Sequence, residues 1–268
     1  TSYLSKGGDR LGILFLEKGA SQRPSKVIYD RKYSSFSTSK KEDYNWEEIL
    51  KDASNFHFTG ITPALGENIV EILIDALNIC KKLNITVSCD LNYRKKLWNY
   101  GKKPSEVMKE LVKYADVLIA NEEDIQKSLE IQTSIDVSKG QLDIEAYKNL
   151  IQSVKKDFPN LSTIAITLRE SFSADNNAWS GILYNNDRIF VSQKYQIQDI
   201  VDRVGGGDAF SAGLIFGLDE YQNDFQKALD FAVAASALKH TISGDFNLVN
   251  KNEVLSLMEG NGSGRVQR

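Results

Sequence analysis

The stretch DIVDRVGGGDAFSAGLIFGL, residues 199–218, places three consecutive glycines directly before an aspartate and an apolar segment with helical spacing. Glycine has no Cβ and reaches positive φ, so another group can approach the backbone amides of such a loop closely. A plain connecting turn seldom needs three glycines in a row. The loop therefore predicts a site where a ligand lies against the backbone.

The chemistry of that loop points to phosphate. Unpaired amides and the positive end of the helix expected from Asp208 onward both favour an anion beside Gly205, Gly206 and Gly207. A carboxylate repels a phosphate that is merely bound, so we interpret Asp208 as a base that accepts the proton of a hydroxyl attacking the γ-phosphoryl group. From this stretch alone, a helix N-cap at Asp208 is an equally good interpretation.

Composition narrows the function classes. The chain has 268 residues, 41% of them hydrophobic, and a formal net charge of -3, which suits one large domain or a domain with an insertion. This charge argues against binding of nucleic acid or anionic membrane through bulk positive charge, and no apolar run reaches the roughly 20 residues of a membrane span. Cys80 and Cys89 lack a CxxC motif and a preceding secretory signal, so we expect buried thiols of a cytoplasmic protein.

The rest of the chain predicts an α/β architecture. From residue 46 onward, helical and strand-like segments alternate, which indicates βα units around a mostly parallel sheet. Asn45 with Glu48 predicts a capping box, and Thr62 before Pro63 predicts the start of the next helix. Residues 181–195 form two alternating runs joined by Asn185, Asn186 and Asp187, a pattern typical of a β-hairpin. Residues 1–40 alternate without a helix and predict an antiparallel β lid, which leaves residues 41–268 as the α/β core.

Three strand-like segments end in polar motifs: CDLNYR (89–94), ANEED (120–124) and TLRES (167–171). In a parallel α/β sheet the carboxyl ends of the strands share one rim, where ligands bind. We therefore expect these motifs and the glycine loop to belong to one site. Only two histidines are present, His57 and His240, and no cluster has the spacing of a zinc or iron site.

These residues carry a family resemblance. DRVGGGDAFSAG resembles the D-T-x-G-A-G-D signature of the ribokinase-like (PfkB) sugar kinases, with Arg203 and Gly206 in place of the commonest Thr and Ala. EKGASQRPSKVIYDR, DLNYRKKLW, TLRES, ALKHTISGDFN and GSGRVQR are similar to segments of the 2-keto-3-deoxygluconate kinases within that family. The resemblance implies a ribokinase-like α/β core with a β lid, ATP as donor, Mg²⁺ as cofactor, and phosphorylation of the terminal hydroxyl of a six-carbon keto-deoxy sugar acid. It also leads us to expect that roughly a quarter of the usual chain, including core strands and an N-terminal glycine pair, is absent here.

The resemblance also implies site residues. Asp208 matches the catalytic base, and Gly205, Gly206 and Gly207 match the anion hole. The positions that match substrate contacts are Phe15, Tyr29, Arg31, Arg94 and Asp245, of which Arg94 also lies near the phosphates in the family. Thr167 and Arg169 match the nucleotide side. Asn121 and Asp124 fall on an N-x-x-E metal-support motif with Asp in place of Glu, so Mg²⁺ is expected to be held through water.

Three alternatives stay open at this point. A kinase of a neutral sugar such as fructose or tagatose would leave Arg31 and Arg94 without a carboxylate partner, and single arginines are more often surface residues. A non-catalytic sensor of sugar acids or nucleotides could use the same fold, although the retained Asp208 argues against it. A nicotinamide-dependent oxidoreductase is a weaker hypothesis, because no G-x-G-x-x-G motif follows a predicted strand. A P-loop enzyme is excluded, because the sequence lacks G-x-x-x-x-G-K-[ST]. The partners expected are a sugar acid, ATP and a second copy of the chain, which would pair with exposed strand edges of the lid.

Overall fold

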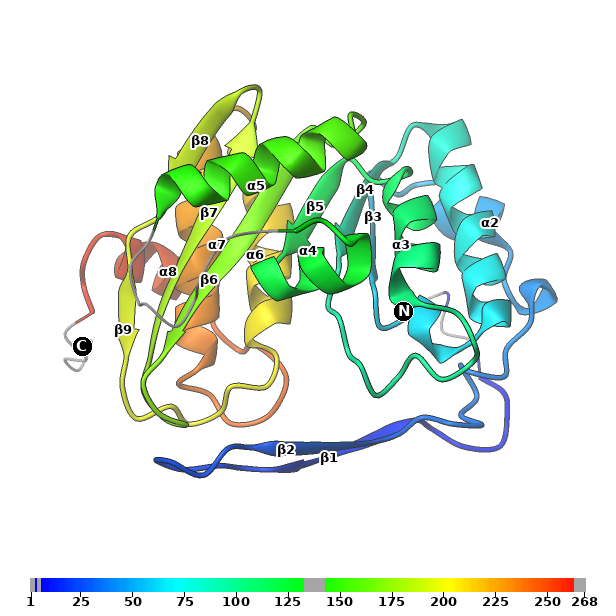
Figure 1. The fold of residues 1–268 in the computed structure, drawn as a ribbon, viewed down its shortest axis with the longest axis horizontal. Coiled ribbons are helices and arrows are strands. Elements are labelled where there is room, and N and C mark those ends of the chain that lie inside the picture. Colours follow the sequence, from blue (N-terminus) through cyan, green and yellow to red (C-terminus); the bar gives the residue numbers. More distant parts are fainter. Residues whose placement is uncertain (1–2, 4–5, 133–142, 263–268) are drawn as a thin grey trace. The chain divides into compact units, whose positions relative to one another are not determined.

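The protein is described by a computed structural model that covers residue 3, residues 6–132 and residues 143–262 (Figure 1). The chain divides into two compact units. The first comprises Thr1–Glu17, Val27–Asp136 and Gln141–Ile164, and the second comprises Lys18–Lys26, Val137–Gly140 and Ala165–Arg268. The predicted division into a lid over residues 1–40 and a core over residues 41–268 stays a prediction. Among the described residues, no helix is both long and apolar enough to cross a membrane.

The first unit contains the parallel part of the sheet. Strands β3 (Asn55–Thr59), β4 (Thr86–Asp90) and β5 (Val117–Ala120) are parallel neighbours, with Phe56 opposite Val87 and Cys89 opposite Leu118. The helices of this unit are α1 (Trp46–Leu50), α2 (Glu67–Leu83), α3 (Pro104–Val112), α4 (Glu122–Leu129) and α5 (Ile144–Asp157). Each of these strands precedes a helix along the chain, which brings their carboxyl ends to one edge.

Helix α2 shows how local sequence places the core. One face buries Ile69, Ile72, Leu73, Ala76, Leu77 and Cys80. The helix ends where Asn84 adopts a left-handed conformation with φ 54°. Its expected start at Pro63 is wrong, because Pro63–Leu65 forms a separate 3-10 turn and α2 begins at Glu67. At Asn45 half of the predicted capping box is present: the Asn45 side chain accepts a hydrogen bond from the Glu48 amide, but the Glu48 carboxylate accepts from Lys51.

The second unit combines antiparallel strands with three helices. Strand β6 (Thr163–Ser171) begins in the first unit and continues into the second, and the strand order is β3-β4-β5-β6-β7-β8. Strands β8 (Arg188–Val191) and β9 (Tyr195–Ile197) are both antiparallel to β7 (Asn177–Asn185). The predicted hairpin is confirmed, with Asn186 and Asp187 at φ 47° and 59° in a two-residue turn.

Glycines allow the helices of the second unit to approach closely. Helices α6 (Gly206–Glu220) and α7 (Phe225–Lys239) precede α8 (Lys251–Met258). A Cβ at Gly213 would lie 3.0 Å from the Cα of Ala232, and one at Gly217 would lie 2.9 Å from the Cα of Ala228. Gly181 of β7 lets Leu229 and Val233 of α7 pack on the strand at 3.1 and 3.2 Å from its ideal Cβ. This packing fixes the start of α6, where the glycine loop lies.

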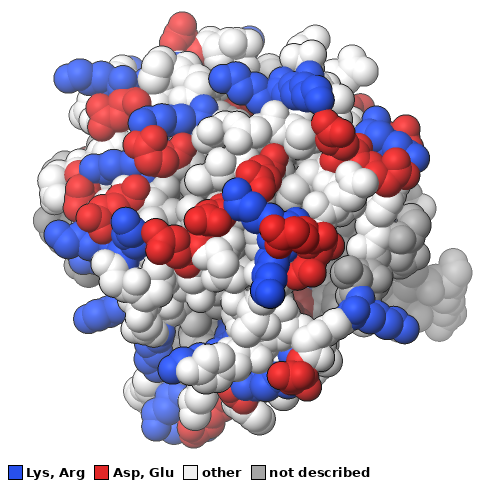
Figure 2. All heavy atoms as spheres, turned by 90° about the vertical axis from the view of Figure 1, so that its right-hand side faces the viewer, with Lys and Arg blue, Asp and Glu red and all other residues white. Residues whose placement is uncertain are grey.

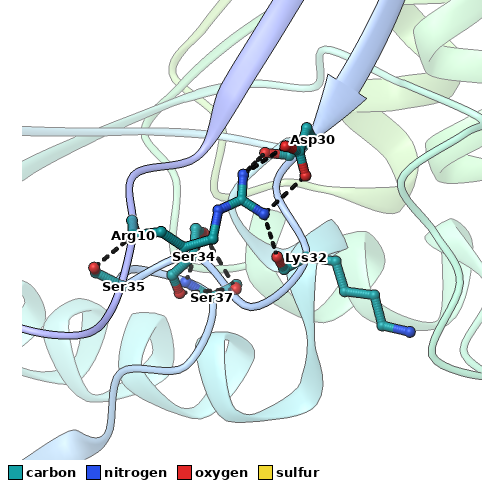
Figure 3. Close-up of polar contacts among 6 residues, drawn as sticks. All are labelled: Arg10, Asp30, Lys32, Ser34, Ser35 and Ser37. Atoms are coloured by element: carbon teal, nitrogen blue, oxygen red, sulfur yellow. Dashed lines mark hydrogen bonds and ion pairs between the residues drawn. The ribbon is translucent and has the colours of Figure 1, made fainter.

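The segment predicted as a lid contains a two-stranded sheet of β1 (Ile13–Glu17) and β2 (Lys26–Asp30). Its base is held by Arg10, which donates hydrogen bonds to the Asp30 carboxylate at 2.8 Å and to the Asp30 carbonyl at 2.9 Å (Figure 3). The amide and hydroxyl of Ser35 both donate to the carbonyl of Arg10 at 2.7 Å. These bonds fix the chain immediately next to Arg31.

Candidate active site

The glycine loop forms the start of helix α6. Gly205 is the N-cap with φ 77°, and Gly206 and Gly207 are the first residues of the helix. Of the three glycines, all of which can reach positive φ, only Gly205 adopts it, and Gly206 and Gly207 have helical backbone. Nothing lies within 4 Å of an ideal Cβ at Gly207, so the first turn of α6 has an open side. An amide-rich helix start with open space beside it suits a phosphoryl group.

Position 205 requires a glycine because the backbone of Asp245 lies directly beside it. A Cβ there would lie 2.0 Å from the carbonyl oxygen of Asp245 and 3.0 Å from its carboxylate Oδ1. The chain around Asp245 is drawn to the loop by two hydrogen bonds, from the Val201 amide to the His240 carbonyl at 2.9 Å and from the Gly244 amide to Asp202 at 3.0 Å. The structure thus brings together the glycine loop and the predicted substrate contact Asp245, although they are 40 residues apart in numbering.

Behind the loop, Gly206 packs against His240. A Cβ at Gly206 would lie 2.9 Å from Cε1 of His240, and the carbonyl of Gly206 accepts a hydrogen bond from the Ser236 hydroxyl at 2.7 Å. The Nδ1 of His240 lies 2.7 Å from the carbonyl of Ser236. Burial lowers the pKa of His240, and the hydrogen bond with Ser236 opposes that shift. His240 therefore supports the loop from within, as a structural residue.

Asp208 occupies the first turn of α6 and is exposed to solvent. The alternative interpretation of Asp208 as the helix N-cap is wrong, because Gly205 is the N-cap and no side chain caps this helix. Thr167 and Arg169 of β6 belong to the same unit, the first half-buried and the second exposed. The charge of Arg169 contributes to lowering the pKa of His240, the residue that packs against Gly206.

In the first unit, the segments after β4 and β5 come together. Asp124 in α4 accepts a hydrogen bond from the Tyr93 amide at 3.0 Å, and its own amide donates to the Asn121 side chain at 2.8 Å. Burial raises the pKa of Asp124 to about 6, while the Tyr93 amide and the charge of Arg94 oppose this rise. Arg94 is exposed and donates to the Tyr93 carbonyl. Arg94, Asn121 and Asp124 thus form one cluster.

The donor set of this cluster limits how it could hold Mg²⁺. Asn121 already serves as the N-cap of α4, and Asp124 supplies a single carboxylate. Among the residues that the structure describes, no group of three or more His, Cys, Asp or Glu side chains could hold a metal ion. Mg²⁺ usually keeps several waters and binds through one or two carboxylates plus phosphates. The cluster therefore fits support of a hydrated ion rather than a complete protein cage.

Of the predicted lid residues, Phe15 lies on β1, Tyr29 lies on β2, and Arg31 directly follows β2. Phe15 is 58% exposed, and the guanidinium of Arg31 lies over the ring of Tyr29, 5.2 Å from its centroid. Lys96 donates to the carbonyl of Val27 and so ties the segment after Arg94 to β2. Within the first unit, this hydrogen bond links the strand that carries Tyr29 to the segment that carries Arg94.

The tip of the lid belongs to the second unit and contacts the chain before the glycine loop. Lys18 donates to the Val201 carbonyl at 2.9 Å and forms an ion pair with Asp202 at 3.4 Å. The Ala174 amide donates to the Ser21 carbonyl at 2.8 Å. The sequence analysis did not predict Lys18 or Asp202 as site residues. For Asp202, its position at the start of the motif DRVGGGD could have indicated a place in the site.

The predicted residues therefore fall into two sets. Those of the first unit are Phe15, Tyr29, Arg31, Arg94, Asn121 and Asp124; those of the second unit are Thr167, Arg169, Gly205, Gly206, Gly207, Asp208 and Asp245. Elsewhere, Figure 2 shows a face on which Lys and Arg lie interspersed with Asp and Glu. Exposed pairs such as Lys82 with Glu47 contribute little to stability.

Comparison with known proteins identifies relatives over nearly the whole chain. The pfkB family of carbohydrate kinases matches residues 1–251. The crystal structure of 2-dehydro-3-deoxygluconokinase from Thermotoga maritima is 48% identical, with a TM-score of 0.89, and the match covers 97% of this chain and 76% of that protein. A pfkB family carbohydrate kinase from Listeria grayi is 30% identical, with a TM-score of 0.83 and coverage of 95% and 75%. The 2-dehydro-3-deoxygalactonokinase of Haloferax volcanii is 31% identical over 95% of this chain and 72% of its own length. The predicted ribokinase-like α/β fold, with a mixed and mostly parallel sheet flanked by helices, is confirmed.

Proposed function

Because the chain belongs to the pfkB family of carbohydrate kinases, we propose that it transfers the γ-phosphoryl group of ATP to the terminal hydroxyl of 2-keto-3-deoxygluconate. The observation that carries the proposal is the start of α6, where Gly205 turns the backbone, nothing lies within 4 Å of an ideal Cβ at Gly207, and Asp208 is exposed in the same first turn. The 48% identity to the Thermotoga maritima enzyme supports the choice of sugar acid.

In the proposed reaction Asp208 is the general base. Its carboxylate takes the proton of the sugar hydroxyl, whose oxygen forms a bond to the γ-phosphorus while the bond to the β–γ bridging oxygen breaks and ADP leaves. The amide of Gly207 and the dipole of α6 stabilise the negative charge on the transferred group, whereas the amide of Gly206, also expected in the anion hole, already donates to the Arg203 carbonyl at 3.3 Å. Asp208 is exposed, as a base that must meet a substrate has to be.

ATP and Mg²⁺ complete the proposal. Thr167 and Arg169 lie on the nucleotide side, and the charge of Arg169 acts on His240, which packs against Gly206. Asn121 and Asp124 support Mg²⁺ through water, and Asp124 must be ionised to do so, which its raised pKa allows at neutral pH. When bound, the ion neutralises charge on the phosphate oxygens.

The substrate contacts are assigned by charge and position. Arg31 and Arg94 bind the carboxylate of the sugar acid, Tyr29 and Phe15 cover it from the lid, and Asp245 accepts from a hydroxyl. Arg31 is held by the Arg10 and Asp30 network at the lid base and by the ring of Tyr29. A planar guanidinium pairs with a carboxylate in a two-donor fork. A neutral ketose offers these arginines no anion.

The lid also suits pairing with a second copy of the chain. Its strands expose Ile13, Leu14, Phe15 and Ile28, of which Ile28 is 65% exposed. Apolar side chains on a two-stranded sheet with open edges are typical of surfaces that become covered. We place the protein in the cytoplasm, where ATP is available, and the free buried thiols of Cys80 and Cys89 fit a reducing compartment.

The test is a coupled ADP-release assay with Mg²⁺ and ATP. The substrates are 2-keto-3-deoxygluconate, 2-keto-3-deoxygalactonate, fructose and tagatose. We expect strong preference for the keto-deoxy acids over both ketoses. Preference for a ketose would replace the sugar-acid assignment by a neutral-sugar kinase. Binding of the acid without ADP release from any substrate would favour a sensor instead.

A further inference from the structure

A hollow of about 660 Å³ lies in the first unit, at the amino ends of strands β4 and β5. Its walls are the end of α2, the start of β4, the end of α3 and the residues just before β5 and β6. The motifs that contain Arg94 and Asp124 follow the carboxyl ends of β4 and β5 instead. Because β4 has five residues at about 3.3 Å each, roughly 15 Å of strand separates the hollow from that edge.

Asp116 is a wall residue that neighbouring backbone holds firmly in place. Its carboxylate Oδ2 accepts a hydrogen bond from the Val87 amide at 2.8 Å, and its own amide donates to the Val87 carbonyl at 2.8 Å. Its carbonyl accepts from the amide of Ser162 at 2.9 Å. No residue that the structure describes donates to the other carboxylate oxygen, Oδ1, and Asp116 is only half-buried. A fixed acceptor is therefore left for a ligand.

Other wall residues offer further hydrogen-bonding groups. The hydroxyls of Thr86 and Tyr114 and the side-chain amide of Asn84 line the hollow, and within the described part of the chain none of them has a partner. Ile85 and Ala115, both buried, add apolar surface. A concave site of this size, with apolar walls and a few convergent polar groups, is typical of small-molecule binding.

The charges around the hollow favour an uncharged ligand. Its four charged wall residues balance, with Lys81 and Lys113 against Glu110 and Asp116. Lys113 is paired with Glu110 at 2.7 Å. Helices α2 and α3 both end at the hollow, and the carboxyl end of a helix disfavours an anion. The candidate active site differs in this respect, because Arg31 and Arg94 provide it with cations.

We propose that this hollow is a second binding site, which takes a neutral ring compound with two adjacent hydroxyl groups. The Oδ1 of Asp116 has lone pairs for both hydroxyls, and hydrogen bonds to an ionised acceptor are stronger than neutral ones. Asn84, Thr86 and Tyr114 bind the remaining polar atoms, and the carbon face of the ring packs on the apolar wall. Two sources share this chemistry: a free pyranose sugar and the ribose of a nucleoside.

Asp116→Asn is the variant that tests the acceptor. The single oxygen of the asparagine side chain is taken by the Val87 amide, so its NH₂ group replaces Oδ1 and offers donors where the ligand needs an acceptor. Asp143→Asn is the matched control. Asp143 lies in the same unit, outside the hollow, and its carboxylate likewise accepts from a backbone amide, that of Ala146 at 3.0 Å.

The measurement is calorimetric titration of the whole chain with D-glucose, D-galactose and adenosine, with D-gluconate and 2′-deoxyadenosine as comparison ligands. We expect at least one of the first three to bind with a Kd below about 1 mM. Asp116→Asn should weaken this binding about tenfold or more, whereas Asp143→Asn should leave it unchanged. A pyranose as the ligand should bind better than gluconate, and adenosine as the ligand should bind better than 2′-deoxyadenosine.

The titration is independent of the proposed kinase activity, because it contains no ATP and the active site is proposed to prefer the acid over neutral sugars. Thr86→Val removes a wall hydroxyl without touching the bonds of Asp116, so it replaces Asp116→Asn if that variant does not fold. The proposal is overturned if none of the three ligands binds. It is also overturned if the bound ligand keeps its affinity in Asp116→Asn or, where that variant does not fold, in Thr86→Val.

Discussion

Gly205→Ala is expected to destabilise the protein, whereas Gly207→Ala, two residues further, is not. Gly205 has φ 77°, a conformation that costs an alanine about 1–2 kcal/mol. The new Cβ would also lie 2.0 Å from the Asp245 carbonyl oxygen, which is backbone and can move only with its loop. Together these effects should cost about 2–4 kcal/mol of unfolding free energy. For a chain of this size that is a fall in Tm of roughly 5–15 °C.

Gly207→Ala separates stability from activity. Gly207 lies in the first turn of α6, without positive φ and with nothing within 4 Å of its ideal Cβ. Alanine there should leave Tm unchanged or raise it, since helix propensity favours alanine by about 0.5–1 kcal/mol. The same Cβ enters the open side where the phosphoryl group is proposed to lie, so kcat should fall about tenfold or more.

Both variants are measured by thermal unfolding and by ADP release. A Gly205→Ala protein with the wild-type Tm would show that the Asp245 loop moves freely, and the argument from backbone contact would fail. A Gly207→Ala protein with wild-type kcat would remove the open side of α6 from the anion site.

Three further predictions follow from the site. Asp208→Asn should lower kcat by roughly 10²-fold or more while leaving the Kd of ATP, measured by calorimetry, nearly unchanged; unaltered kcat would reduce Asp208 to a charge at the helix start. Arg31→Ala should lose roughly 2–5 kcal/mol of sugar-acid binding and most of the preference for acid over ketose, with partial recovery in Arg31→Lys; an unchanged preference would exclude Arg31. Burial lowers the pKa of His240 below its ordinary 6.5, so the unfolding free energy should decline as pH drops below about 6.5, and His240→Gln should flatten this decline in urea titrations; identical pH profiles would contradict it.

Local patterns determined the elements that carry the site. The helix predicted after Thr62 is present as α2, although it begins at Glu67 rather than at Pro63. The Asn186 and Asp187 pair predicts the hairpin turn, because these residues tolerate positive φ. The motifs after β4 and β5 predicted a shared rim, because parallel strands place their carboxyl ends together. Each inference needs only residues close in sequence or a general rule of sheet geometry.

Contacts between distant segments decided the rest. Which of the three glycines needs positive φ depends on the carbonyl of Asp245, and no local signal marks that approach. The amide of Tyr93 meets Asp124 across 31 positions, and Lys18 meets Asp202 across an even longer separation. Lys239 reads in the sequence as an ordinary helix-end lysine, yet packing removes it completely from water. Burial and the charges of neighbouring loops set the energy of such groups, and both depend on how the chain packs in three dimensions.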